Sequence, residues 1–315
     1  MGSQGMQQLM MGTPALHWLR LLLENGGADR GYWGRAAMVA FTGLLTCPVR
    51  VVEHLLYARS VRQTAIRQDP IFIIGHWRSG TTWLHNLMSR DPSLGFVTGL
   101  QMAAPDAYLV GTPIMRAVLK LAKPVRPMDR IPMSPDSPEE DEFVMAKTSP
   151  HSAYHFWSFP KRTRHYFEKY ALFRGISESE LSEWRADYMR VLKKTTLSHG
   201  GRRLVLKNPI NMGRTEQLLK LFPHAKFVHI FRDPRVVFAS SRNLYTRALP
   251  MFQLQAITPQ EVEDNVLMMY KDLMGAFLSD RHLIPPENLV EVRFEDLERK
   301  PLDELRRIYT CLGLP

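Results

Sequence analysis

The 315-residue sequence predicts an α/β fold, in which helices cover both faces of a parallel sheet. Short apolar runs typical of buried strands alternate with helical patterns, and a hydrophobic content of 45% is enough for a large core. The predicted strands are Ile71–Ile74, Arg203–Lys207, Lys226–Phe231 and Asn288–Phe294. The predicted helices are Thr81–Arg90, Glu178–Ser198, Asn211–Phe222, Pro234–Thr246, one from Thr258 to about Ser279, and Leu302–Cys311. We therefore expect an N-terminal helical segment, residues 1–68, packed on an α/β domain of residues 69–315.

The N-terminal segment allows two interpretations. Residues 32–62 mix aromatic and apolar side chains with arginines, and their longest apolar run, Ala36–Leu45, is too short to span a bilayer. We favour a layer of helices packed on the sheet over a segment lying in a membrane interface. Two distant cysteines, Cys47 and Cys311, and the lack of a signal-peptide pattern favour a reducing, cytoplasmic location, with peripheral membrane contact left open.

The first predicted strand leads into a loop suited to an anion. Gly75 and Gly80 have the spacing of a nucleotide P-loop, and a helical pattern follows. Such a strand, loop and helix direct backbone N–H groups at one point. The P-loop lysine is replaced by Thr81, followed by Thr82, and Arg78 lies within the loop. The sequence thus predicts a P-loop-like sheet that binds an anion without the usual magnesium-triphosphate machinery, although a helix merely capped by hydroxyl groups is the alternative.

A second basic segment follows the strand Lys226–Phe231. Arg232 stands at the end of this strand, Asp233 is a predicted N-cap, and Pro234 would begin the next helix. Ligands of open α/β sheets bind at this edge, and Ser240 lies about two helical turns further on. The hydroxyl group of Ser240 is therefore expected to reach the same ligand as Arg232.

Together these segments resemble the sulfotransferase family that uses 3′-phosphoadenosine 5′-phosphosulfate (PAPS), most closely a largely bacterial branch with GHWRSGTT, LKNP and FRDPR motifs. The resemblance implies that the 5′-phosphosulfate is bound by Arg78, Ser79, Gly80, Thr81 and Thr82. It also implies that Trp83 stacks near the adenine, that Arg232 and Ser240 bind the 3′-phosphate, and that Lys207 contacts the transferring sulfonate. The implied reaction moves a sulfonate group to a hydroxyl or amine acceptor, releases PAP and requires no metal.

The general base is harder to place. Cytosolic family members carry a His two residues after the sheet lysine, where this chain has Pro209, and residues 95–101 lack the Glu of other branches. The acidic run of residues 139–142 is typical of this branch, and Glu140 is our first choice, with Glu142 and His76 as rivals and His151 and His155 as weaker ones. If the run is helical, Glu139 and Glu142 share one face and Glu140 lies on another. A solvated helix start is the alternative.

The net charge of +10 suits a cofactor with two phosphate groups and a sulfonate, but also nucleic acid or an anionic membrane. No zinc-finger or RNA-binding signature is present, so we expect no nucleic-acid partner and instead a small-molecule, lipid or glycan acceptor. A P-loop kinase, a non-catalytic PAP-binding protein and a basic membrane-binding protein remain as alternatives. Lys123–Pro138, with five prolines, is expected to be a lid, an acceptor-site wall or a surface crossover. Family members usually continue past the matching helix into a basic segment that completes the cofactor site, and the sequence does not decide between a truncated and an untruncated C-terminal end.

Overall fold

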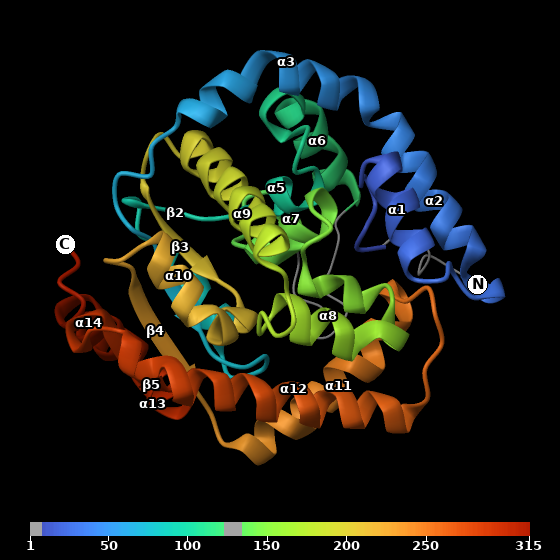
Figure 1. The fold of residues 1–315 in the computed structure, drawn as a ribbon. Helices are drawn as coiled ribbons and strands as arrows, with labels where there is room; N and C mark the ends of the chain where they lie inside the picture. The colour runs from blue at the N-terminus through green and yellow to red at the C-terminus, as the bar shows by residue number, and fades with distance from the viewer. Residues whose placement is uncertain (1–7, 123–133) are drawn as a thin grey trace.

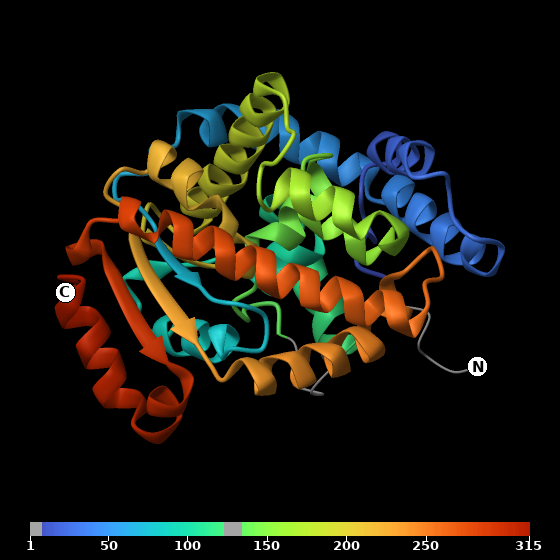
Figure 2. The ribbon, with the colours of Figure 1, turned by 60° about the horizontal axis from the view of Figure 1, so that its bottom comes forward.

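A five-stranded parallel sheet organises the protein. The computed structural model describes residues 8–122 and 134–315. The strand order is β2-β3-β1-β4-β5 (Figures 1 and 2). The strands are β1 Ile71–Ile74, β2 Leu94–Gly95, β3 Arg203–Lys207, β4 Lys226–Phe231 and β5 Leu289–Arg293. The predicted strands therefore all form, with β5 trimmed by one residue at each end, whereas β2 was not predicted because two residues are too few to show a strand pattern.

Helices cover both faces of the sheet, as the sequence predicts. Successive side chains of a strand point to opposite faces. Phe72 and Ile74 of β1 accordingly belong to one hydrophobic core, and Ile71 and Ile73 to another. The first core is closed by α7 Asp141–Thr148, α8 Thr163–Tyr170, α9 Glu178–Ser198, α10 Thr215–Leu221, α11 Pro234–Phe252 and α12 Pro259–Asp280. The second is closed by α4 Thr81–Met88, α13 Phe294–Arg299 and α14 Pro301–Cys311.

Local capping explains where several helices begin. Ser177 and Thr258 form capping boxes with the glutamates three residues later, at the starts of α9 and α12. Asp233 caps α11 by accepting a hydrogen bond from the Arg235 N–H. The predicted helix Asn211–Phe222 is only partly α-helical, because a 3₁₀ segment, η5 Pro209–Arg214, precedes α10. This segment buries Arg214, whose guanidinium binds the Tyr170 carbonyl and Glu142 in the core.

Three helices form the N-terminal segment at one edge of the molecule (Figure 1): α1 Ala15–Glu24, α2 Trp33–Leu45 and α3 Cys47–Gln63. Trp18 of α1 donates from its indole to the Ala36 carbonyl of α2, 3.0 Å away, and both residues join the first core. Glu53 of α3 pairs with Lys194 of α9 and accepts from backbone N–H groups at the start of α6, Tyr108–Ala122. The division into two domains stays a prediction.

Within residues 8–122 and 134–315, no single helix is long and apolar enough to cross a membrane, and α2 with α3 meets that requirement only as a pair bent by 45°. Most of the predicted lid, residues 123–133 of Lys123–Pro138, lies outside the described residues. The end of that segment is described. Pro138 forms an isolated antiparallel bridge with Thr98, just before the helix α5, Gly99–Ala103.

Candidate functional site

The loop between β1 and α4 has the backbone of a tight anion-binding turn. Arg78 and Gly80 have positive φ angles of 70° and 97°. Gly75 passes so close to β4 that a Cβ atom there would lie 2.2 Å from the Ile230 carbonyl oxygen. Gly80 is the N-cap residue of α4, and no side chain caps the helix. The first N–H groups of α4 have no intrahelical acceptor, which leaves them available to a ligand at the C-terminal edge of the sheet.

Arg78 joins this loop to the second basic segment. Its Nε donates to the Ser240 Oγ of α11 over 2.8 Å, although the two residues are 162 positions apart. Arg232, at the end of β4, places its guanidinium 4.0 Å from the centre of the Phe294 ring. Trp83 of α4 meets the same ring edge-on at 6.0 Å. Arg78 and Ser240 therefore lie together, and Arg232 and Trp83 lie together against Phe294, a residue predicted only as the end of a strand.

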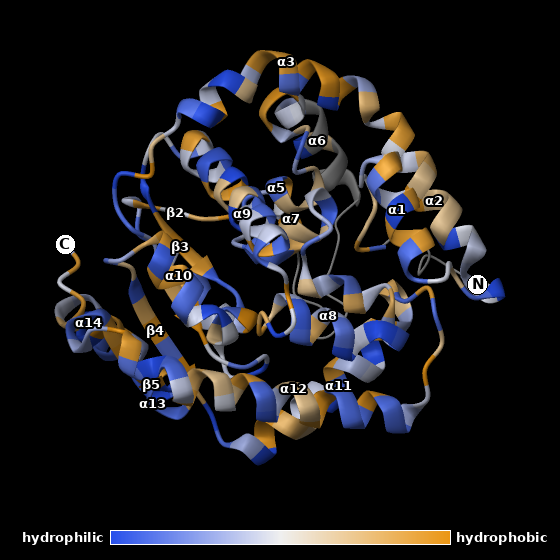
Figure 3. Ribbon diagram, in the orientation of Figure 1, coloured by the Kyte–Doolittle hydropathy of each residue, from blue (hydrophilic) through white to orange (hydrophobic). Residues whose placement is uncertain are grey.

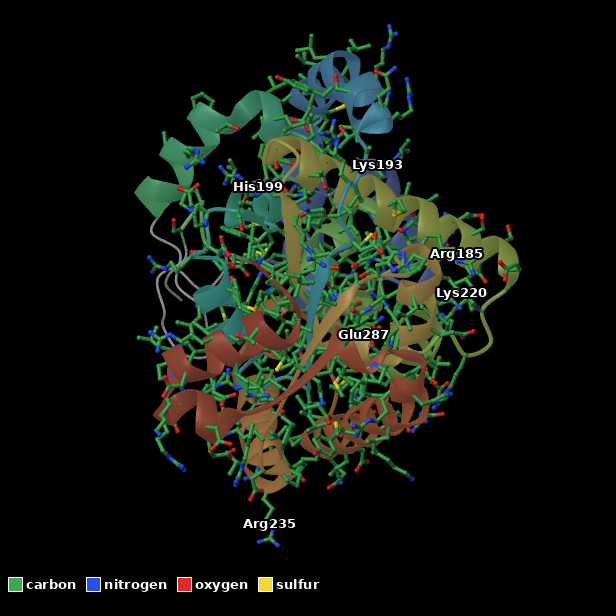
Figure 4. The ribbon with its side chains drawn as sticks, turned by 90° about the vertical axis from the view of Figure 1, so that its left-hand side faces the viewer. Arg185, Lys193, His199, Lys220, Arg235 and Glu287 are labelled. Carbon is green, nitrogen blue, oxygen red and sulfur yellow. The ribbon has the colours of Figure 1, made fainter. Side chains whose placement is uncertain are left out.

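Phe294 also explains why residue 80 is glycine. A Cβ atom at position 80 would lie 2.3 Å from the Phe294 ring, so any side chain would collide with it. Arg235 of the same FRDPR motif behaves differently from Arg232: it is exposed and points away from the molecule into solvent (Figure 4). Of the two arginines of this motif, Arg232 therefore lies against the Phe294 ring, whereas Arg235 points into solvent.

Lys207 lies at the same edge and forms a buried ion pair with Glu140. Lys207 ends β3 opposite Ile73 of β1, two residues before Gly75. The Lys207 Nζ contacts Glu140 Oε1, and side-chain exposures of 3% and 9% keep both charges out of bulk water. The Tyr154 hydroxyl donates to the other oxygen of Glu140 and accepts from the Trp77 indole at 3.1 Å. Burial and the adjacent Glu140 raise the Tyr154 pKa well above its usual value, so this hydroxyl stays protonated as a donor.

Glu140 lies beside Lys207 because of backbone contacts that no local sequence pattern predicts. The Glu139 N–H donates to the Val97 carbonyl over 2.8 Å, and the bridge between Thr98 and Pro138 continues this pairing. These contacts hold residues 138–140 beside the chain that leaves β2, the neighbour of β3. The expectation that Glu139 and Glu140 lie on faces of a helix was wrong: α7 begins at Asp141, and Glu140 is its extended N-cap residue.

Glu142 is fully buried and forms an ion pair and several hydrogen bonds inside the protein. Its carboxylate accepts from both terminal nitrogens of Arg214, at 2.7 and 3.2 Å, and both side chains are fully buried. Ser152, the Ala153 N–H and the Asn208 amide donate to the same carboxylate. Five donors therefore occupy Glu142, which fixes α7 against β3 and η5.

His76 is buried in the loop, and its contacts are with Trp77 and Tyr270. Its Nδ1 donates to the Trp77 carbonyl at 2.9 Å, its ring packs 4.9 Å from Tyr270, and burial lowers its pKa to about 4. Beside it a cavity of about 320 Å³ reaches Arg232 and the side chain of His229. Within the described chain, the Nε2 atoms of His76 and His229 have no hydrogen-bond partner. The cavity adjoins the loop between β1 and α4, and its lining is mainly apolar.

The remaining predicted candidates lie elsewhere in the core. His151 contacts Asp187 and Glu183, and His155 contacts the Ala146 carbonyl. Asp141, beside Glu142, is fully buried, and this burial raises its pKa to about 7. Among the described residues, no group of three or more His, Cys, Asp or Glu is arranged to hold a metal ion. Arg78, Arg232 and the pair of Lys207 with Glu140 lie at the same edge of the sheet, at or beyond the C-terminal ends of β1, β4 and β3.

Known proteins are similar to this chain along most of its length. Residues 70–315 match the sulfotransferase family. The omega-hydroxy-beta-dihydromenaquinone-9 sulfotransferase Stf3 of Mycobacterium bovis, and the same enzyme of Mycobacterium tuberculosis, are 34% identical over 307 residues, which is 97% of this chain and 79% of theirs. Two solved structures share the fold. Sulfotransferase STF1 of M. tuberculosis has a TM-score of 0.70 at 19% identity, covering 96% of this chain and 82% of its own. STF9 of Mycobacterium avium has a TM-score of 0.69 at 20% identity, covering 97% and 84%.

Proposed function

The chain belongs to the sulfotransferase family, and from this premise we propose that it transfers a sulfonate group from PAPS to a hydroxyl group of a lipid. The observation that carries the proposal is the meeting of Arg78, Arg232 and the Lys207–Glu140 pair at one edge of the sheet. Cations and helix N–H groups there suit the phosphates and sulfonate of the donor. A carboxylate beside them suits the proton that the acceptor must lose.

The donor would be held by two groups of residues. The backbone of residues 78–82 and the Arg78 guanidinium would bind the 5′-phosphosulfate. Arg232 and Ser240 would bind the 3′-phosphate, and Trp83 and Phe294 would pack against the adenine. The contact between Arg78 and Ser240 supports this arrangement, because it keeps the two anion sites within reach of one nucleotide.

In the transfer step the acceptor oxygen would form a bond to sulfur while the bond between sulfur and the bridging phosphate oxygen breaks. Negative charge grows on that bridging oxygen, and Lys207 would stabilise it as PAP leaves. Glu140 would take the acceptor proton. The hydrogen bond from the Tyr154 hydroxyl would hold the Glu140 carboxyl group in position. Glu140 is favoured over both rivals as the base, because five donors occupy Glu142 and the contacts of His76 are with Trp77 and Tyr270, whereas Glu140 contacts Lys207.

The acceptor is proposed by analogy with the relatives. Stf3 is named for a hydroxylated menaquinone derivative, and 34% identity along nearly the whole chain supports a related prenyl-type alcohol here. Such an acceptor resides in a membrane, so the enzyme would work at a membrane surface. A P-loop kinase is disfavoured, because Thr81 occupies the position of the phosphate-binding lysine.

Calorimetric titration with PAP, with adenosine 5′-phosphosulfate and with ATP-Mg tests the donor. PAP should bind and ATP-Mg should not. Replacing Arg232 by alanine should cost PAP roughly 1.5–3 kcal/mol, because a charge-assisted contact is lost, but should leave adenosine 5′-phosphosulfate, which lacks the 3′-phosphate, nearly unaffected. Arg235→Ala is the matched control from the same motif and should change neither affinity. An equal loss for both ligands in Arg232→Ala would make Arg232 a structural residue.

A further inference from the structure

The outward surface of α2 and α3 is apolar, contrary to the usual pattern of a surface helix. Phe41, Leu44 and Leu45 of α2 are 64%, 62% and 67% exposed. Val52, Leu55 and Leu56 of α3 are 44%, 76% and 63% exposed. Within each helix the spacing of three or four residues puts these side chains on one face. We call these six residues the apolar face; Figure 3 shows hydrophobic colour along α2 and much of α3 at the rim of the molecule.

The exposed charged side chains of residues 30–63 have one sign. Glu53 is the only carboxylate between residues 33 and 63. It is 2% exposed and paired with Lys194. Arg30 precedes α2, and Arg59 and Arg62 lie in the last turns of α3; all three are exposed and form no ion pair within the described residues. Within residues 30–63 the surface therefore combines exposed apolar side chains with basic ends and no exposed acid.

The inner faces of the same helices are firmly attached to the protein. Val39 of α2 is fully buried, and a Cβ atom at Gly43 would lie 2.2 Å from the Thr13 carbonyl oxygen. Arg50 of α3 donates to the carbonyls of Gly12 and Gly43. These contacts leave one face of each helix packed and the other bare, which suits lying on a surface rather than crossing a membrane.

We propose that the apolar face docks onto the interface of an anionic lipid bilayer. Its side chains would enter the boundary between headgroups and acyl chains, and Arg30, Arg59 and Arg62 would contact acidic headgroups. The charge pattern selects this occupant, because apolar insertion flanked by cations and free of exposed acids complements a negative membrane surface. The inference goes beyond the proposed function, because docking requires neither PAPS nor a particular acceptor.

Co-sedimentation of the full chain with phosphatidylcholine vesicles, with or without phosphatidylglycerol, tests the proposal in the absence of nucleotide. Wild type should bind the anionic vesicles. The variant Phe41→Ser, Leu45→Ser, Leu55→Ser, Leu56→Ser should bind them at least about tenfold more weakly. Arg59→Gln with Arg62→Gln should weaken binding to anionic vesicles alone, by about fivefold for each arginine. The matched control is Leu267→Ser, Leu278→Ser, Leu283→Ser, Leu302→Ser, which removes exposed leucines from other surfaces and should bind as wild type does.

Several outcomes would overturn the proposal. One is wild type that binds neither vesicle, and another is a control variant that loses binding as much as the apolar-face variant. A third is a wild-type dimer that the apolar-face variant converts to monomer with unchanged vesicle binding, which would assign the face to a second copy of the chain. Unchanged thermal unfolding and PAP affinity in the variant show that its fold is intact. Vesicle binding by a protein that fails to bind PAP would refute the proposed function and leave this inference standing.

Discussion

The buried ion pair between Lys207 and Glu140 leads us to predict that a second substitution will restore part of the stability lost by the first. Lys207→Met removes a buried cation and leaves the Glu140 carboxylate, among the described residues, with Tyr154 as its remaining side-chain partner. Breaking a buried pair from one side typically costs roughly 3–5 kcal/mol, because an uncompensated charge remains in the interior. Adding Glu140→Gln to that variant removes the stranded charge. The double variant should therefore be more stable than Lys207→Met alone.

Urea unfolding of the ligand-free protein at neutral pH measures this difference, followed by both circular dichroism and tryptophan fluorescence so that coincident transitions justify a two-state treatment. The matched control is Lys220→Met with Glu216→Gln, the exposed pair on α10 whose charges lie 2.8 Å apart. That pair should contribute less than about 1 kcal/mol, and its two single losses should add. If the losses at Lys207 and Glu140 simply add as well, the two residues do not form the buried pair described here.

Three further predictions concern the donor, the transfer step and pH. Arg78→Ala and Thr82→Ala should each weaken PAP binding in calorimetry while leaving the thermal unfolding temperature nearly unchanged, and unaltered affinity in both would remove the loop from the donor site. Lys207→Ala should lower kcat more than PAP affinity, because its charge acts on the leaving oxygen, and Glu140→Gln should lose least activity with acceptors that ionise easily. Burial lowers the pKa of His155 to about 3, so between pH 6.5 and 3 the unfolded chain binds a proton that the folded chain does not, and stability falls with falling pH. From pH 7 to 5, wild type should lose about 2 kcal/mol more unfolding free energy than His155→Gln, and equal losses would contradict the assignment.

The strands whose own C-terminal ends carry site residues were the predictable part of this protein. Apolar runs predict strands β1, β3 and β4. The Gly75–Gly80 spacing marks the end of β1, and Arg232 marks the end of β4. Because parallel strands align their C-terminal ends, those residues had to share one edge. Local patterns were therefore sufficient to predict the site residues that stand directly at the end of a strand.

Residues carried to the site by long-range pairing were not predictable in the same way. Glu140 depends on the two-residue strand β2 and on the bridge between Thr98 and Pro138, neither of which leaves a pattern in a single sequence. Tyr154 was not among the predicted site residues, since nothing local links it to a carboxylate 14 positions earlier. Phe294 could have been noticed, because it ends the predicted strand Asn288–Phe294, at the edge of the sheet where ligands bind.

Transfer of labelled sulfonate tests the central claim most directly. Wild type would be incubated with PAPS labelled at sulfur and a prenylated quinone that carries a terminal hydroxyl group, with the same lipid lacking the hydroxyl as control. The account predicts one labelled sulfonate on each molecule of hydroxylated lipid converted, an equal amount of PAP released, no label on the control lipid, and a product yield at least about a hundredfold lower with Glu140→Gln. PAP release without labelled lipid for any hydroxyl acceptor offered, or full activity in Glu140→Gln, would contradict it.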